Sequence, residues 1–514
     1  MAPHRFESFL MASQYTFNRA TGKFEQRRGG RRGKRFYQLA SNESFVGWET
    51  HDVSADASMH GQLVSMVARA RDLERNNDYV IRHLALQKAN VIGPRGFKFT
   101  SCRKARNGRV DRTFNRALEA AWKAAGKLKH SPTTCGKMTR KDLLDLVLDR
   151  WMVDGECLVI HHPGFAENKW RYAVQVVDSM RLDWTLNGRL PNGNAVKMGV
   201  EVDEYDRPVA YHILDQHPSE GIFGWNATNR PRQRIEAEHV THVYSIERPG
   251  QSRGVTHLAA PGLRARMLDK FEEAVVLGAR IAASKMGFYK PNDEYDGEAP
   301  GEEENGTADL RQEVEPGLFE LLPRGLDVDT FDPNYPPANL EEFHKTIARG
   351  IASGLGGNYN HIFNNYEGVN YSSLREAKLT DRDAWRTLQG FIVDHFEEPN
   401  FLRWAMVQQI NKVAGLDSAK LAASMADDCY RFSGRGWQWV DPLKEVQAAN
   451  LAIAGGHTSP QRIIEDTSGA DPEELLEETA EFMKMAEAQG VPLSWAQPEL
   501  PLNDQPGNDN AGGD

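Results

Sequence analysis

Apolar residues recur at three- and four-residue steps in several stretches of the chain, which is the pattern of amphipathic helices. The clearest stretch covers residues 141–153, where Leu143, Val147 and Trp151 fall on one helical face. The same periodicity predicts further helices over residues 61–92, 111–128, 257–286 and 340–355, and after Pro399. We therefore expect a largely helical framework.

A second pattern interrupts the helices. Short runs rich in β-branched residues are separated by turn signals such as Asn192-Gly193, which is typical of antiparallel strands. These runs cover residues 157–161, 172–177, 199–202, 209–214 and 240–244. They predict a compact antiparallel β-module of about ninety residues, so the fold class is α+β.

Several helix starts carry their own signals. Ser373 stands three residues before Glu376, which is the spacing of a capping box. Proline occupies an expected first helical position at residues 442, 460 and 472, where its missing N–H costs nothing. A bundle of short C-terminal helices fits this spacing. A strand-like run at residues 318–322 lies before these helices.

The composition is that of an ordinary globular protein, with 514 residues, 40% hydrophobic and 26% charged. This length suits two to four domains. No apolar run is long enough for a membrane span, and the N-terminus has no secretory signal pattern. Cys102, Cys135, Cys157 and Cys429 are widely spaced. They suggest neither a zinc site nor a disulfide framework, and reduced thiols are expected.

Charge is divided unevenly along the chain. Residues 1–150 hold 29 Lys and Arg against 14 Asp and Glu, whereas the remainder holds 33 against 58. The basic part favours either DNA contact or packing against acidic neighbouring subunits. Residues 1–60 are expected to form a flexible basic arm, and residues 497–514 a disordered tail. Residues 293–315, with ten acids and one arginine, predict an exposed acidic loop.

One loop is nearly free of charge. Residues 354–371 contain five asparagines, four aromatics and four glycines, and Glu367 is their single formal charge. Such a surface offers weak hydrogen bonds and no cation for a phosphate backbone. Where a polyanion must slide past, this composition avoids strong binding.

Four blocks of residues, taken in order, resemble the portal proteins of tailed bacteriophages of the lambda type. The first is an arginine-rich helix with two asparagines that later ends at Asn-Val-Ile-Gly. The blocks are Arg69–Asn77 with Asn90–Gly93, Glu247–Val255, Asn370–Ala377 and Trp437–Glu445. They span most of the chain, and their shared order makes the resemblance specific.

The resemblance implies a ring of twelve subunits around a DNA channel. Each subunit would have a mainly helical wing that carries the β-module, two long stem helices, a small clip and a helical crown. The implied segments are wing 61–256, stem 257–286, clip 287–338, stem 339–355, tunnel loop 356–371, wing 372–440 and crown 441–496.

The resemblance also implies partners and roles. The protein would sit at one capsid vertex of the virion after assembly in the host cytoplasm. It would nucleate the head with capsid and scaffold proteins, dock the terminase large subunit, hold the head–tail connector and let duplex DNA exit. No enzyme activity, cofactor, metal or membrane is implied. Residues expected to line the tunnel are Asn358, Tyr359, Asn360, His361, Asn364, Asn365 and Tyr366. Those expected to face the motor are Glu302, Glu303 and Glu304.

Two alternatives come from other classes of protein. Gly250–Gly254 matches GxSxG, which would make Ser252 the nucleophile of a serine hydrolase. His344, His361 and His395 follow it in the order that such a triad needs. Against this, proline and two charges stand between the strand and the serine. The second alternative is a monomeric DNA-binding protein that uses the basic arm. No Walker A sequence is present, so the chain cannot be an ATP-driven motor.

Overall fold

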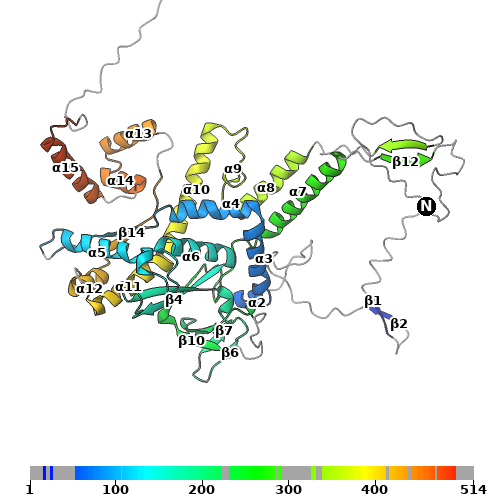
Figure 1. The fold of residues 1–514 in the computed structure, drawn as a ribbon, viewed down its shortest axis with the longest axis horizontal. Coiled ribbons are helices and arrows are strands. Elements are labelled where there is room, and N and C mark those ends of the chain that lie inside the picture. Colours follow the sequence, from blue (N-terminus) through cyan, green and yellow to red (C-terminus); the bar gives the residue numbers. More distant parts are fainter. Residues whose placement is uncertain are drawn as a thin grey trace, which may run out of the picture.

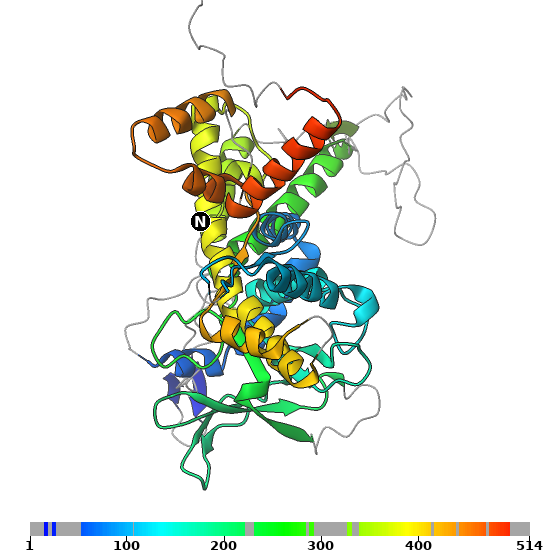
Figure 2. The same cartoon turned by 90° about the vertical axis from the view of Figure 1, so that its left-hand side faces the viewer.

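The computed structural model describes residues 53–105, 107–220, 231–283, 287–291, 326–330, 339–412, 416–437, 442–468 and 472–493, and two short paired strands, β1 (Tyr15–Asn18) and β2 (Lys23–Gln26). It is a mixed α+β structure (Figures 1 and 2). In both views the main sheets lie at the bottom, α13–α15 lie at the top, and a layer of helices lies between. The predicted fold class is confirmed at this level.

The helical layer forms around α6 (Arg140–Asp154), which matches its predicted span. Thr139 and Asp142 make a reciprocal capping box at its start, and Gly155 ends it with φ +90°. Its apolar face is fully buried, as the periodicity predicts. The body also contains α2 (Ala55–His60), α5 (Arg112–Ala125), η3 (Leu128–His130), α11 (Glu398–Asn411) and α12 (Ser418–Ala426).

The single helix predicted over residues 61–92 is wrong. Asn77 adopts an extended conformation, and its side chain accepts a hydrogen bond from the Val80 amide at 3.1 Å. An asparagine that bonds backbone in this way favours a helix start over a helix interior. The stretch is therefore divided into α3 (Leu63–Asn76), α4 (Asp78–Gln87) and a π-helical turn η2 (Lys88–Ile92).

The β-module consists of antiparallel sheets, as predicted. A five-stranded sheet has the order β10-β9-β8-β7-β6, and a three-stranded sheet has the order β11-β4-β5. Short 3₁₀ turns η4 (Ser179–Arg181) and η6 (Ala237–His239) connect the strands. The strands are β4 (Glu156–Pro163), β5 (Tyr172–Val177), β6 (Gly188–Arg189), β7 (Ala195–Lys197), β8 (Val200–Val202), β9 (Pro208–Leu214), β10 (Arg232–Glu236) and β11 (Val240–Tyr244).

Two helices run together away from the body, α7 (Gly262–Ala283) and α8 (Leu340–Gly354) (Figure 1). Phe271 and Phe343 pack edge to face between them with ring centroids 5.1 Å apart. The predicted start at residue 257 is too early, because residues 257–260 form a turn before Pro261. The hairpin of β12 (Gly287–Pro291) and β13 (Leu326–Thr330) lies beyond the far ends of these helices. The strand-like run 318–322 and the acidic loop 293–315 lie outside the described residues.

The C-terminal third begins with α10 (Tyr371–Ile392) and a π-helical turn η7 (Val393–Glu397). The predicted capping box at Ser373 is wrong, because Asn370 is the N-cap and accepts from the Ser373 amide at 2.8 Å. An asparagine is as good a cap as serine, and it stands three residues earlier. The proline-started helices are confirmed as α13 (Pro442–Ala454), α14 (Pro460–Ser468) and α15 (Pro472–Ala488).

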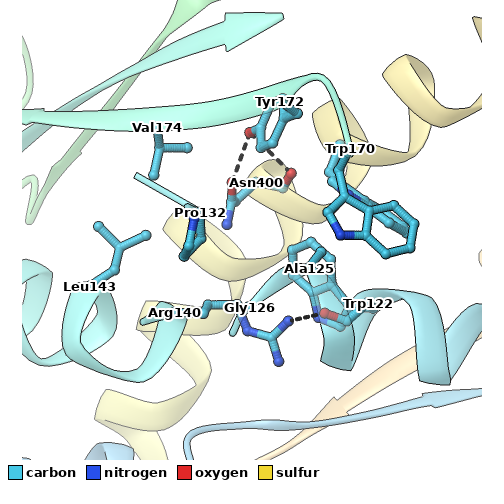
Figure 3. Close-up of a pocket in the computed structure, with 11 residues that line it drawn as sticks. Trp122, Ala125, Gly126, Pro132, Arg140, Leu143, Trp170, Tyr172, Val174 and Asn400 are labelled. Atoms are coloured by element: carbon cyan, nitrogen blue, oxygen red, sulfur yellow. Dashed lines mark hydrogen bonds between the residues drawn. The ribbon is translucent and has the colours of Figure 1, made fainter. Parts of the chain in front are cut away.

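The largest hydrophobic core joins parts of the chain that are far apart in sequence. Trp122 on α5 contacts Phe401 and Trp404 on α11, with ring centroids 5.2 and 5.1 Å apart. A small cavity of about 20 Å³ lies there (Figure 3), and Tyr172 donates to the Asn400 side chain on its wall at 2.7 Å. A cavity of this size admits a water molecule and nothing larger, so it is part of the packing and not a ligand site.

Candidate functional site: the segment between α8 and α10

The segment that the resemblance places at the channel begins where α8 ends. Gly356 has φ +68°, a conformation that glycine adopts without strain. Asn358 then caps a one-turn helix, α9 (Tyr359–Ile362), and its side chain accepts from the Asn360 amide at 2.9 Å. The sequence suggested only a loop here. A short capped helix forms because asparagine satisfies one of the amides that a helix start leaves unpaired.

Asp381 on α10 holds this short helix in place. Its carboxylate is buried, accepts the Asn358 amide at 3.2 Å and forms an ion pair with the His361 side chain. Ile362 is also buried, with its side chain beside Gly357. The first half of the segment is therefore fastened to the body by one carboxylate and one apolar contact.

Aromatic packing holds the middle of the segment. Tyr359 stacks on Phe363 at 5.4 Å, and Phe363 in turn lies 4.3 Å from the Tyr79 ring on α4. The Asn365 side chain donates to the Tyr359 hydroxyl at 3.1 Å. Tyr359 and Asn365 thus turn toward the protein and are half-buried.

The exposed part of the segment follows. Asn364 has φ +51° and accepts from the Arg82 guanidinium at 3.2 Å. The Tyr366 side chain is 45% exposed and lies 6.2 Å from the His361 ring. Tyr371, which was not among the predicted tunnel residues, is 59% exposed at the start of α10.

The structure thus brings all seven predicted tunnel residues into one compact turn, but it exposes them unequally. Asn364 and Tyr366 are exposed, while the other five are half-buried. Sequence reasoning also missed the cations that neighbouring helices bring to this turn: Arg82 bonds Asn364, and Lys345 lies 3.6 Å from Glu367. Periodicity could have placed Lys345 on the exposed face of α8, but no local signal identifies Arg82. The predicted motor-facing residues Glu302, Glu303 and Glu304 lie outside the described residues.

A buried histidine lies beneath the segment. His83 on α4 is 3% exposed, and a Cβ on Gly357 would lie 3.9 Å from its Nδ1. Burial, together with the nearby His257, lowers the pKa of His83 to about 4. The imidazole is therefore neutral near pH 7.

The GxSxG match at Gly250–Gly254 belongs to a different region, which we call the joint: Gly155, Glu156, Arg253 and Gly254. Arg253 is fully buried, and its Nε donates to both oxygens of Glu156 at 2.9 Å. Its Nη2 also donates to Glu156, and its two terminal nitrogens reach backbone carbonyls, including that of Met198 at 3.0 Å. Burial opposes ionisation of Glu156, but Arg253 and His242 outweigh it and hold its pKa at about 2.

The glycines of the joint allow two backbone segments to touch. A Cβ on Gly254 would lie 2.0 Å from the Gly155 carbonyl oxygen, and a Cβ on Gly155 would lie 2.3 Å from the Val255 carbonyl carbon. Both distances are below any real contact. The glycine that resembled part of a catalytic signature is required for close packing.

Ser252 has a structural partner as well. It is 7% exposed, and its hydroxyl donates to Asp56 Oδ2 at 2.8 Å while its amide donates to Asp56 Oδ1 at 2.8 Å. The preceding strand, β11, belongs to an antiparallel sheet, whereas a nucleophile elbow needs a parallel strand.

The histidines that a catalytic triad would need have other partners. His344 lies 2.6 Å from Glu272, His361 pairs with Asp381, and His395 bonds the Phe391 carbonyl at 3.0 Å. The structure gives no support to the hydrolase alternative. Within the described ranges no cluster of three or more His, Cys, Asp or Glu could hold a metal, and no described helix is long and apolar enough to cross a membrane.

Comparison with known proteins agrees with the resemblance noted from the sequence. Residues 41–389 match the family model described as phage portal protein, lambda family. The chain is 30% identical over 461 residues to a probable portal protein of Halomonas phage phiHAP-1, covering 88% of this chain and 86% of the relative. It is 23% identical over 486 residues to portal protein B of Escherichia phage lambda, covering 87% and 89%.

A search of solved structures found the virion of a native gene transfer agent particle. The matched chain there is 14% identical, with a TM-score of 0.41, and the match covers 78% of this chain and 92% of that one. The family match spans well over half of the sequence, and the phiHAP-1 relative is aligned over most of its length. This chain belongs to the lambda family of phage portal proteins.

Proposed function

We propose that twelve copies of this portal protein form a closed ring around duplex DNA, with residues 356–371 at the constriction. The observation that carries this proposal is the course of the chain around α7 and α8. These helices project together from the body, and the segment that leaves α8 folds back against α4 and α10 at their base (Figure 1). This is the path that the chain would follow if α7 and α8 were the two stem helices and the tunnel segment followed the end of α8 nearest the body.

The surface of that segment suits a sliding polymer. Asn364, Tyr366 and Tyr371 offer exposed hydroxyl and amide groups that bond phosphates weakly and briefly. Two cations on neighbouring helices have partners: Lys345 lies 3.6 Å from Glu367, and Arg82 bonds the neutral Asn364 side chain and keeps its charge. Repeating a free lysine around a ring would instead bind DNA strongly and in a salt-dependent way.

The remaining roles follow from a ring at one capsid vertex. In this proposal the clip, with Glu302, Glu303 and Glu304, faces the terminase large subunit during packaging and the connector afterwards. The crown faces the capsid interior, and the ring nucleates head assembly with capsid and scaffold proteins in the host cytoplasm. The protein itself performs no bond chemistry. It guides DNA in during packaging and out at ejection.

The uneven charge of the chain supports a ring interface. A closed ring needs a heterologous contact, in which one face of each subunit meets a different face of the next. The basic N-terminal part and the acidic remainder would provide complementary faces. Native mass spectrometry over a salt series tests this: we expect rings to dissociate as salt rises, and rings indifferent to salt would contradict it.

The tunnel assignment is tested by placing a cation at Tyr366, the most exposed aromatic among the seven predicted tunnel residues. We expect Tyr366→Lys to leave rings with a central hole in negative-stain images but to slow DNA packaging at least several-fold, because each ring would present a circle of lysines to the phosphates. The slowing should lessen at higher salt.

Tyr205→Lys is the matched control, since Tyr205 is 75% exposed on a turn of the β-module. It should package DNA like the unmodified protein. Intact Tyr366→Lys rings that package DNA at the normal rate would refute the tunnel assignment. Isolated particles in place of rings for the unmodified protein would refute the ring itself.

A further inference from the structure

Two cysteines that are far apart in the sequence lie opposite each other in the fold. Strand β14 (Tyr430–Ser433) pairs antiparallel with β3 (Lys98–Ser101), and Tyr430 is opposite Ser101. One residue further along this register, Cys429 stands opposite Cys102. The Cys102 amide donates to the Cys429 carbonyl at 3.0 Å, so the two chains are still side by side there.

Both side chains point to the outer face of this strand pair. Neighbouring residues of a strand alternate between faces, and Ser101 and Tyr430 are buried. Cys102 is accordingly exposed and Cys429 partly exposed. Directly opposed residues of antiparallel strands have Cα atoms about 4.5–5.5 Å apart, which is within the usual range of about 4.4–6.8 Å for a disulfide.

The Cys429 sulfur is held only weakly in its present position. Both cysteines carry thiols in the structure. The Cys429 thiol donates to the Asp427 carbonyl at 3.6 Å, which is a weak contact, and rotation about its Cα–Cβ bond would release the sulfur. Cys429 is also partly exposed and is the first residue after a turn that includes Asp428 at φ +48°.

A small reagent can reach Cys102. This residue lies on the wall of an open polar cavity of about 770 Å³ between β3, α5 and α15. Arg112 and Arg116 line one side, and Glu477 and Glu481 line the other. The opening is large enough for a small disulfide such as oxidised glutathione.

We propose that Cys102 and Cys429 are an oxidisable dithiol that closes to an intrachain disulfide. The Cys102 thiolate attacks one sulfur of oxidised glutathione, and the first glutathione leaves as a thiolate. The Cys429 thiolate then attacks the Cys102 sulfur of this mixed disulfide and displaces the second glutathione. The two cysteines together lose two protons and two electrons, and one oxidised glutathione becomes two reduced glutathiones.

The disulfide would restrain the chain just before the C-terminal helices α13–α15. After β14 the chain passes over the body, where Trp437 stacks on Trp385 with centroids 5.7 Å apart, and then enters α13. The disulfide would hold β14 on β3 just before this passage. It would form when the protein leaves a reducing compartment, and it does not depend on the ring proposed above.

The experiment uses the full-length chain, purified in dithiothreitol and then exchanged into oxidised glutathione. After remaining thiols are alkylated, proteolysis and mass spectrometry should show a peptide that links Cys102 to Cys429 in the majority of molecules. Cys135 is the matched control, because it is also exposed but has the Thr133 hydroxyl as its neighbour at 3.4 Å. It should be recovered alkylated or as a glutathione adduct.

Unfolding provides a second readout. Oxidation should raise the midpoint of thermal unfolding by several degrees in the unmodified protein and leave that of Cys429→Ser unchanged. The proposal is overturned if both thiols are recovered alkylated, or if Cys102 stops at the glutathione adduct. Linked peptides that combine isotope-labelled with unlabelled chains would also overturn it, because the bond would then be intermolecular.

Discussion

The joint and the segment between α8 and α10 are both rich in glycine and polar residues, yet they are opposites as structures. At the joint, Glu156 and Arg253 are fully buried and neutralise each other. In the segment, Asn364 and Tyr366 are exposed, and one buried carboxylate, Asp381, anchors the turn. The sequence at the joint matches a catalytic motif, whereas the sequence of the segment matches no known motif.

The difference shows what a short pattern can predict. A GxSxG match specifies residue types, but the strand direction and the partner of the serine decide the chemistry. Here the serine bonds Asp56 and the second glycine touches another backbone. The absence of charge over residues 354–371 is a weaker pattern, but it describes a surface property directly. It remains informative once the fold is known.

The largest effect should come from filling the contact at the joint. Gly254→Ala would place a methyl group 2.0 Å from the Gly155 carbonyl oxygen. Because backbone lies on both sides and cannot move aside, we expect the protein to lose its folded state or at least about 4 kcal/mol of unfolding free energy.

Gly250→Ala is the control for that change, since a Cβ there meets open space. Its φ of +75° makes the substitution mildly strained, and a loss of about 1 kcal/mol is expected. Circular dichroism during thermal unfolding compares the two. Equal midpoints would mean that the two backbones are not in contact.

Removing the buried cation should have the next largest effect. Arg253→Met leaves Glu156 buried with only the His242 side chain and the Gly254 amide as partners, and breaking a buried pair on one side costs about 3–5 kcal/mol. Lys270→Met is the control, because Lys270 and Glu273 form an exposed pair on α7 and such pairs contribute less than about 1 kcal/mol. Urea unfolding measures both. A loss as small as the control's would show that water reaches the Glu156 carboxylate.

Acid should destabilise the body before it affects the joint. Burial lowers the pKa of His83 and of His257 to about 4, and that of His161 to about 3. Unfolded histidine titrates near 6.5, so below that pH the unfolded state binds more protons than the folded one and stability falls. At pH 5.5 each histidine should cost about 1 kcal/mol relative to pH 7.

The joint should respond only at lower pH. The pKa of Glu156 is held at about 2, so its contribution is present above the unfolded pKa and is lost as pH falls from about 4.3 toward 2. Urea unfolding at pH 7, 5.5 and 3.5 samples both windows. Stability that stays constant down to pH 5 would mean that the three histidines are not buried as neutral rings.

Much of the fold could be predicted because it follows from the local periodicity of apolar residues and from local turn and cap signals. The apolar face of α6, the strands of the β-module and the proline-started helices all follow from side chains within a few residues of each other. The failures have a common cause. Asn77 and Asn370 act as helix caps through their own side chains. The sequence alone does not show whether an asparagine in a helical pattern lies inside the helix or caps its start.

The candidate site was harder to predict, because its partners come from distant segments. The sequence identified the uncharged stretch, but it could not show that Asp381 would anchor His361, or that Arg82 would reach Asn364. Asp381, His361 and Arg82 belong to three separate helices, and Asn364 lies in a loop, so their meeting depends on tertiary packing. For the same reason, the sequence could not predict the ion pair of Glu156 with Arg253 or the strand register that places Cys102 opposite Cys429.

The smallest effect on stability is expected from His361→Ala, which tests whether Asp381 anchors the first half of the segment. His361→Ala removes the ion pair with Asp381 and leaves that carboxylate with the Asn358 amide. Global stability should fall by only about 1–2 kcal/mol, because the core around α6 is untouched. Hydrogen exchange at the α9 amides should become markedly faster, since local opening then requires less free energy.

His395→Ala is the matched control for the anchor. His395 is exposed, stacks on Phe391 and bonds the Phe391 carbonyl, and both of these contacts lie away from α9. Its removal should leave exchange in α9 unchanged. If His361→Ala also leaves that exchange unchanged, aromatic packing by Tyr359 and Phe363 holds the turn. The segment would then resemble the joint, in which packing and not solvent-exposed polarity determines the conformation.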